Sequence, residues 1–176
     1  MNASLVGRTL GGYLITEMIG AGGMATVYKG YRADIDRYVA IKVLPPHPGL
    51  DSQFMDRFKL EARTIARLQH PHILPLYDYG VEQDILFLVT AYIAGGSLAD
   101  RIDSGPMRSS ETSRLLRQAA VALDYAHRQG VIHRDIKPAN ILVRADYTVA
   151  LTDFGIAHIS GSELTQLGDL LGSPLY

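Results

Sequence analysis

The sequence predicts an α+β fold in two parts: an antiparallel sheet of about five strands with one helix in residues 1–93, then a mainly helical region in residues 94–176. Short apolar runs separated by turn residues fill the first part, and one amphipathic segment interrupts them. Gly95 and Gly96 then precede two further helical segments. A chain of 176 residues has the size of one domain or of two small lobes.

The strands expected in the first part are residues 13–19, 27–33, 38–44, 73–79 and 85–92. The first two strands flank a glycine-dense turn, and residues 34–37 suit a hairpin connection between the next two. Apolar residues recur at three- and four-residue steps over residues 53–69, which predicts a helix. Asp51 or Ser52 can serve as its N-cap.

The second part is expected to contain two helices and then two short strands, at residues 97–102, 110–129, 141–143 and 149–151. Gly130 is placed to end the longer helix. Residues 160–176 have the composition of a loop.

Composition excludes several classes of site and partner. The 17 basic and 18 acidic side chains give a formal charge of −1, so nucleic acid has no general electrostatic attraction to the chain. The absence of cysteine excludes a disulfide framework, a cysteine zinc site and a thiol nucleophile. Residues 85–96 form an apolar stretch too short to span a bilayer, and residues 1–10 lack an apolar signal core. We expect a cytoplasmic protein with no membrane segment and no nucleic-acid partner.

Residues 20–25 form a glycine-rich turn that fits the dinucleotide pattern G-x-G-x-x-G/A. A Rossmann site needs a helix directly after this turn, whereas a strand-like run follows here. A hairpin whose backbone N–H groups cover the phosphates of a nucleotide fits better. A plain glycine turn remains the alternative if the motif is taken alone.

One lysine lies in an otherwise apolar strand. Lys42 ends the run Val-Ala-Ile-Lys, where its ammonium could reach phosphates if a carboxylate such as Glu61 held it. Taken singly, an edge-strand lysine and a solvated helix glutamate are the alternatives.

Two further motifs indicate phosphoryl transfer. Residues 133–140 read His-Arg-Asp-Ile-Lys-Pro-Ala-Asn, and residues 153–155 read Asp-Phe-Gly. Asp135 would orient the attacking hydroxyl and accept its proton, and Lys137 would stabilise the charge that develops on the transferring group. Asp153 and Asn140 supply the oxygen ligands that Mg²⁺ prefers.

With these motifs in this order, residues 13–176 resemble the bacterial eukaryotic-like (Hanks-type) serine/threonine protein kinases. The resemblance implies the protein kinase-like two-lobe fold, with a small nucleotide-binding lobe at residues 1–93 and a partial large lobe carrying the catalytic and activation loops at residues 94–176. It also implies ATP and Mg²⁺ (or Mn²⁺) as cofactors, and protein substrates that accept the γ-phosphate on Ser/Thr hydroxyls.

The resemblance carries site roles as well. Catalytic roles fall to Asp135, Lys137, Lys42 and Glu61, with Lys42 paired to Glu61, and the metal ligands are Asn140 and Asp153. Ile65, His133 and Phe154 would form an internal hydrophobic stack. The nucleotide would contact the loop, the adenine pocket, the gatekeeper Thr90 and the hinge, which together comprise Ile19, Gly20, Ala21, Gly22, Gly23, Met24, Ala25, Val27, Ala40, Lys42, Thr90, Ala91, Tyr92, Ile93 and Leu142.

The resemblance also leads to expectations about regulation of the kinase and about the stability of this chain. Arg134 resembles the arginine that meets a phosphate on an activation loop, and Thr165 would be an autophosphorylation site. The family's domain continues with large-lobe helices beyond the last residue here. We therefore expect a poorly stable, inactive fragment in which Leu115, Ala119 and Leu123 lack packing partners.

Two other functions compete with protein phosphorylation. One is a nucleotide-binding interaction module without catalysis, which the intact catalytic residues oppose. The other is a small-molecule phosphotransferase of related fold, which the full string from His133 to Asn140 disfavours.

Overall fold

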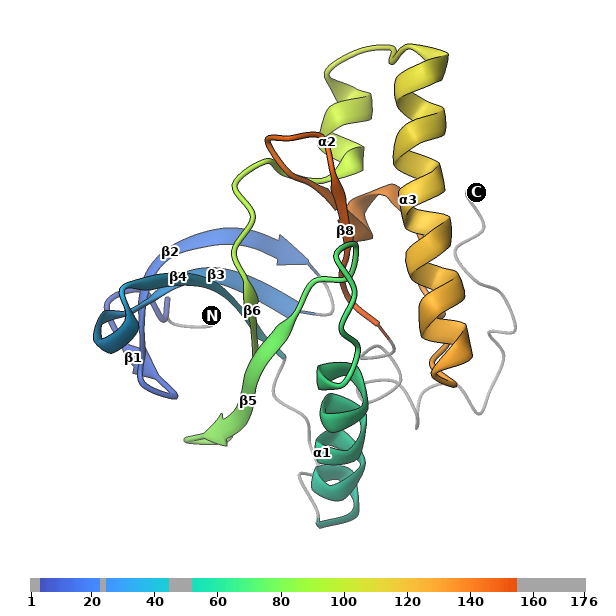
Figure 1. The fold of residues 1–176 in the computed structure, drawn as a ribbon. Helices are drawn as coiled ribbons and strands as arrows, with labels where there is room; N and C mark the ends of the chain where they lie inside the picture. Colours follow the sequence, from blue (N-terminus) through green and yellow to red (C-terminus); the bar gives the residue numbers. More distant parts are fainter. Residues whose placement is uncertain (1–3, 23–24, 45–51, 155–176) are drawn as a thin grey trace, which may run out of the picture.

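A six-stranded antiparallel sheet forms the first part of the computed structural model, which describes residues 4–22, 25–44 and 52–154 (Figure 1). The strand order is β1-β2-β3-β4-β6-β5, so that β3 and β4 lie in its middle and β6 lies next to the edge strand β5. The strands are β1 (Thr9–Leu10), β2 (Tyr13–Gly22), β3 (Ala25–Arg32), β4 (Arg37–Val43), β5 (Leu76–Glu82) and β6 (Ile85–Ala91). The sheet thus has one strand more than expected.

Two differences from the sequence prediction have local causes. The additional strand β1 has two residues, too short to show a periodic pattern, and pairs with β2 after a turn at Gly11 and Gly12 with positive φ. The strand expected from residue 73 begins at Leu76, because the backbone before it bonds elsewhere. The Leu74 N–H donates to the Leu151 carbonyl at 2.8 Å, and Ile73 bridges to Leu151.

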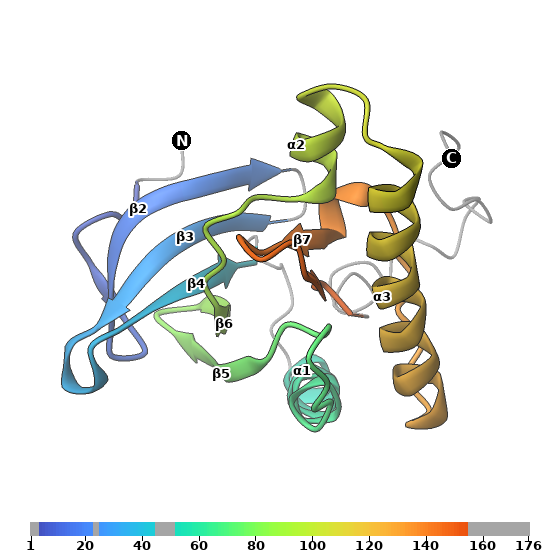
Figure 2. The ribbon, with the colours of Figure 1, turned by 45° about the horizontal axis from the view of Figure 1, so that its top comes forward.

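Helix α1 (Ser52–Ala66) lies beside β5 and covers one face of the sheet (Figure 2). Phe54, Phe58 and Ala62, at the predicted helical spacing, are buried in one cluster with Leu86 and Leu88 of β6. Burial of each large apolar side chain is worth about 1.5–3 kcal/mol, so this stripe attaches α1 to the sheet.

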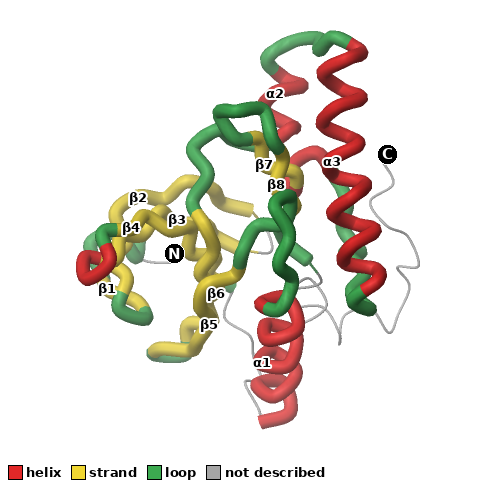
Figure 3. Tube along the Cα trace, in the orientation of Figure 1, coloured by secondary structure: helices red, strands yellow, loops and turns green. Residues whose placement is uncertain are grey.

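The second part contains two helices and a small hairpin (Figure 3). A capping box joins Ser97 and Asp100 at the start of α2, and Gly130 with φ 75° follows the end of α3. The elements are α2 (Leu98–Asp103), α3 (Ser109–Arg128), β7 (Ile141–Val143) and β8 (Val149–Leu151), with a 3₁₀ turn at Pro138–Asn140 before β7. A second 3₁₀ turn, Ala33–Ile35, connects β3 and β4 in the first part. Both hairpin strands match the sequence prediction.

Helix α3 packs on the β7–β8 hairpin. Leu115 and Ala119 are buried in the same core as Val149 and Leu151, and Leu123 packs against that core. The expectation that these α3 side chains lack partners is therefore wrong, because the hairpin covers them. None of the helices within residues 4–22, 25–44 and 52–154 is long and apolar enough to cross a bilayer.

Replacement of Gly95 by alanine is expected to destabilise the fold. A Cβ at this position would lie 1.9 Å from the backbone carbonyl oxygen of Val143, a contact that only a backbone shift can relieve. Gly20→Ala is the matched control, since its Cβ would meet the Val27 side chain at an ordinary 3.8 Å. Urea unfolding should show a loss of about 1–3 kcal/mol for Gly95→Ala alone. Equal stabilities of the two variants would contradict the contact.

Candidate functional site

A cleft of about 530 Å³ opens between the sheet and the second part of the chain. Strands β2, β3, β4 and β6 contribute to one wall, and β7 and the residues after β8 contribute to the other. Thirteen residues predicted from the sequence line it, namely Ile19, Gly20, Val27, Ala40, Lys42, Ile65, Thr90, Ala91, Tyr92, Ile93, Leu142, Asp153 and Phe154. Most of the predicted nucleotide-binding residues are thus gathered around one cavity.

Some predicted residues lie elsewhere. Ala21, Gly22 and Ala25 are described but do not line the cleft, and Gly23 and Met24 lie outside the described residues. Thr165 and the rest of residues 155–176, which include the expected activation segment, also lie outside them.

Several apolar residues that line the cleft are not predicted from the sequence, including Leu74, Leu76 and Leu88. Alternation along β6 could have identified Leu88, because it precedes Thr90 by two positions and therefore shares its face of the sheet. Leu88 also lies opposite Lys42 in the pairing of β4 with β6. The positions of Leu74 and Leu76 depend on the late start of β5, for which the sequence carries no comparable signal.

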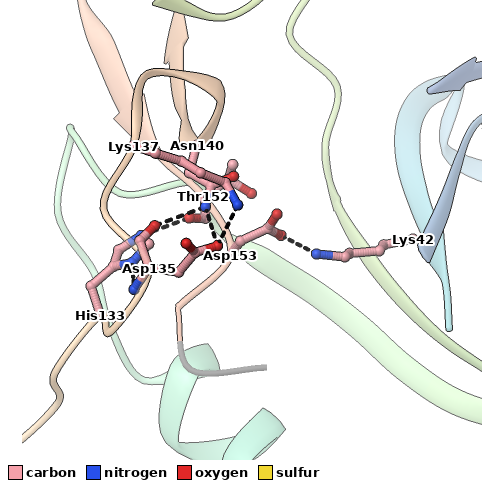
Figure 4. Close-up of polar contacts among 7 residues, drawn as sticks. All are labelled: Lys42, His133, Asp135, Lys137, Asn140, Thr152 and Asp153. Atoms are coloured by element: carbon pink, nitrogen blue, oxygen red, sulfur yellow. Dashed lines mark hydrogen bonds and ion pairs between the residues drawn. The ribbon is translucent and has the colours of Figure 1, made fainter. Parts of the chain in front are cut away.

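Lys42 projects from the middle of the sheet into the cleft. Its Nζ lies 2.7 Å from Asp153 Oδ1 (Figure 4). This ion pair differs from the expected one, in which Lys42 pairs with Glu61. Asp153 takes the ammonium because the chain turns sharply after β8, with φ 66° at Asp153, and brings the carboxylate into the cleft. Glu61 is half-buried on α1.

One carboxylate oxygen of Asp135 accepts hydrogen bonds from two groups, an ammonium and an amide. Lys137 Nζ lies 2.8 Å and Asn140 Nδ2 2.9 Å from Asp135 Oδ2 (Figure 4). Burial alone would raise the pKa of Asp135, but these two contacts outweigh it and lower the pKa below its usual range. The carboxylate is therefore ionised at neutral pH.

His133 connects this loop to the strand end that carries Asp153. One ring nitrogen, Nε2, lies 2.8 Å from the Thr152 carbonyl oxygen, and the other, Nδ1, accepts the Asp135 N–H at 3.3 Å. These contacts require a neutral ring with its proton on Nε2. Burial lowers the pKa of His133 accordingly. Its ring also packs on Phe154 at 4.5 Å between centroids.

Asn140 and Asp153 are brought together by the hairpin between them. Asn140 directly precedes β7, Asp153 follows β8, and the Thr152 N–H donates to the Asn140 carbonyl at 3.0 Å. Both side-chain hydrogen bonds of Asn140 use its amide nitrogen, which leaves the amide oxygen as a ligand. One amide oxygen and one carboxylate fit a divalent cation such as Mg²⁺, which takes few protein ligands alongside phosphate oxygens. No cluster of three or more His, Cys, Asp or Glu side chains suited to a metal occurs within the described residues.

Known serine/threonine-protein kinases are similar to the chain in sequence and in fold. The chain is 39% identical over 175 residues to the serine/threonine-protein kinase PrkC of Bacillus subtilis, covering 98% of this chain and 27% of the relative. It is 40% identical over 166 residues to PknL of Mycobacterium tuberculosis, covering 93% of this chain and 42% of the relative. The crystal structure of the M. tuberculosis PknI kinase domain superimposes with a TM-score of 0.77 at 34% identity, covering 88% of this chain and 62% of that one.

The chain thus spans well under half the length of these two curated relatives. The model of the protein kinase domain family matches residues 13–176, nearly the whole chain. Family membership implies use of ATP and a divalent metal in general. On the matching motifs, the shared fold and the converged site, the chain belongs to the protein kinase domain family.

Proposed function

We propose that this chain is the ATP-binding and catalytic part of a serine/threonine protein kinase, which transfers the γ-phosphate of ATP to Ser/Thr hydroxyls of proteins. The convergence of Lys42, Asp135, Asn140 and Asp153 beside one largely apolar cleft carries the proposal. We place the small nucleotide-binding lobe at residues 1–93 and the part carrying the catalytic loop at residues 94–176.

The adenine ring would occupy the apolar end of the cleft. Val27 and Ala40 from the sheet and Leu142 from β7 line it, so that a planar ring can be sandwiched between the two walls. The backbone of residues 91–93, at the end of β6, would offer hydrogen-bonding groups to the ring edge, beside the gatekeeper Thr90. The triphosphate then points toward Lys42 and the glycine-rich turn.

The charged end of the cleft would bind the triphosphate and the metal. Asn140 and Asp153 are the proposed ligands of Mg²⁺ or Mn²⁺, which when bound neutralises charge on the β- and γ-phosphates. For this, Lys42 exchanges its Asp153 partner for phosphate oxygens, and its ammonium clamps them. Asp153, released from Lys42, would hold the divalent cation together with Asn140. We further propose that Glu61 on α1 partners Lys42 in that arrangement.

Asp135 would orient the acceptor hydroxyl and take its proton. The bond between the γ-phosphorus and the bridging oxygen breaks, a bond from the acceptor oxygen to phosphorus forms, and the hydroxyl proton passes to the Asp135 carboxylate. The contacts that keep Asp135 ionised also fix its orientation. Lys137 lies close enough to stabilise the charge on the transferring group.

Protein acceptors are favoured over the two competing functions. The curated relatives are named serine/threonine-protein kinases, and the sequence keeps every catalytic residue, which opposes a non-catalytic module. Lys137 follows Asp135 by two positions, the serine/threonine pattern of the family. Autophosphorylation at Thr165 remains part of the proposal.

In a full-length version of the protein, replacing Lys42 by methionine or Asp135 by asparagine is expected to lower phosphoryl transfer about 100-fold or more, because each removes a group that stabilises or orients the reacting atoms. Transfer of labelled γ-phosphate would be measured to Ser, Thr and Tyr peptides, small alcohols and aminoglycosides. Lys59→Met, on the exposed face of α1, is the matched control and should leave transfer unchanged. Retained transfer in both variants would overturn these roles, and transfer mainly to aminoglycosides would overturn the protein-kinase assignment.

The free energy of unfolding is expected to fall as pH drops below about 6.5, partly through His133. The folded-state pKa of His133 is lowered, so in this range the unfolded chain binds more protons than the folded chain. His133→Phe keeps a ring against Phe154. In urea titrations its free energy of unfolding should be lower than that of the unmodified chain at pH 8, but should change less between pH 7.5 and pH 5.5. His127→Gln replaces an exposed histidine on α3 and is the control. The pH dependence of its free energy of unfolding should match that of the unmodified chain. An equally steep decline for His133→Phe would show that the ring does not titrate as described.

A further inference from the structure

A second cavity, of about 420 Å³, lies where α2, the start of α3 and the β7–β8 turn meet. The connection between the two helices forms the end of the molecule opposite α1 (Figure 1). Six residues line the cavity, and each carries either a charge or a hydroxyl group: Arg101, Arg108, Ser110, Glu111, Arg114 and Tyr147. It is a polar site, unlike the largely apolar cleft.

The cavity carries an excess of positive charge. Arg101 pairs with Glu111, with its Nε 3.3 Å from Glu111 Oε1 and its Nη2 3.5 Å from Oε2. Arg108 and Arg114 form no ion pair with any residue that the structure describes. Three guanidinium groups thus face one carboxylate, although the whole chain has a formal charge of −1. This local excess favours an anion.

The donor geometry fits a phosphate group. A guanidinium presents a planar fork of N–H donors that matches phosphate oxygens two at a time. Arg114 is oriented by the ring of Tyr147, 5.6 Å from its centroid, so less side-chain entropy is lost when it binds. The hydroxyls of Ser110 and Tyr147 add neutral donors. The charge excess of about two matches a phosphate monoester, which carries about two negative charges at neutral pH.

We propose that this cavity binds the phosphate of a phosphoserine or phosphothreonine in an extended protein segment. Arg108, Ser110, Arg114 and Tyr147 are all exposed, so a free anion would stay largely solvated there. A phosphorylated segment gains contacts along the open rim in addition to those of its phosphate. The proposal does not require the chain itself to transfer phosphate.

The cavity is separate from the nucleotide cleft, although α2 borders both. Asp100 lines the cleft and the adjacent Arg101 lines the cavity. Glu111 competes with the phosphate for Arg101, because the same guanidinium N–H groups serve either anion. Removal of the Glu111 charge should therefore strengthen phosphate binding, whereas removal of either unpaired arginine should weaken it.

The test is a titration of the chain with a fluorescent peptide that carries one phosphoserine in an otherwise uncharged sequence. Arg108→Gln and Arg114→Gln are each expected to raise the Kd about tenfold or more, and Glu111→Gln to lower it. Arg114→Lys, which keeps the charge but loses the fork, should fall between Arg114→Gln and the unmodified chain. Arg67→Gln, an exposed arginine outside the cavity, is the matched control and should bind unchanged. Thermal melting would confirm that each variant is folded.

Two further arms separate the possible sources of binding. Lys42→Met, which removes the ammonium of the cleft, should bind the phosphopeptide unchanged, and a loss there would place the peptide in the cleft and overturn the proposal. The unphosphorylated peptide should not bind. Equal binding of the phosphorylated and unphosphorylated peptides would also overturn the proposal. So would a phosphopeptide Kd for Arg108→Gln and Arg114→Gln equal to that of Arg67→Gln. Inorganic phosphate that binds as tightly as the phosphopeptide would assign the cavity to the free anion instead of a protein segment.

Discussion

The pairing of Ile141 with Leu151 is the constraint on which the rest of the site depends. This register sets the residue before β7 beside the residues after β8, so that Asn140 and Asp153, distant in sequence, meet at one end of the hairpin. The Leu151 N–H also donates to the His72 carbonyl at 2.9 Å, which ties the hairpin to the chain just before β5. A slip of one residue would turn every hairpin side chain to the opposite face.

Two ion pairs hold the charges of the site in partly exposed positions. The side chains of Lys42 and Asp153 are 21% and 29% exposed, and those of Lys137 and Asp135 are 34% and 33% exposed. Pairs screened by water to this degree are worth about 1 kcal/mol or less. Phosphate oxygens and a divalent cation can therefore replace these partners at little cost, as the proposed reaction requires.

The sequence predicts the parts of this molecule whose signal is local. The helical spacing of Phe54, Phe58 and Ala62 and both hairpin strands follow from periodicity, whereas the predicted residues of the cleft follow from the motifs and the family resemblance. What it misses depends on contacts between distant segments. The start of β5 is delayed because Leu74 bonds to Leu151, and Lys42 meets Asp153 because of the turn after β8. The arginine cavity likewise joins three elements, none of which carries a motif alone.

Small side chains on α3 connect the core to the chemistry of the site. Ala119, Ala122 and Ala126 are buried in the core that also contains the β7–β8 hairpin, and their size allows close approach of helix and hairpin. His133 follows α3 in the chain, and its ring bonds to the Thr152 carbonyl just after β8. The packing of α3 on the hairpin therefore fixes how far Asp135 lies from the strand end that carries Asp153, the proposed metal ligand. A larger side chain in this interface would change that separation without touching any group of the cleft.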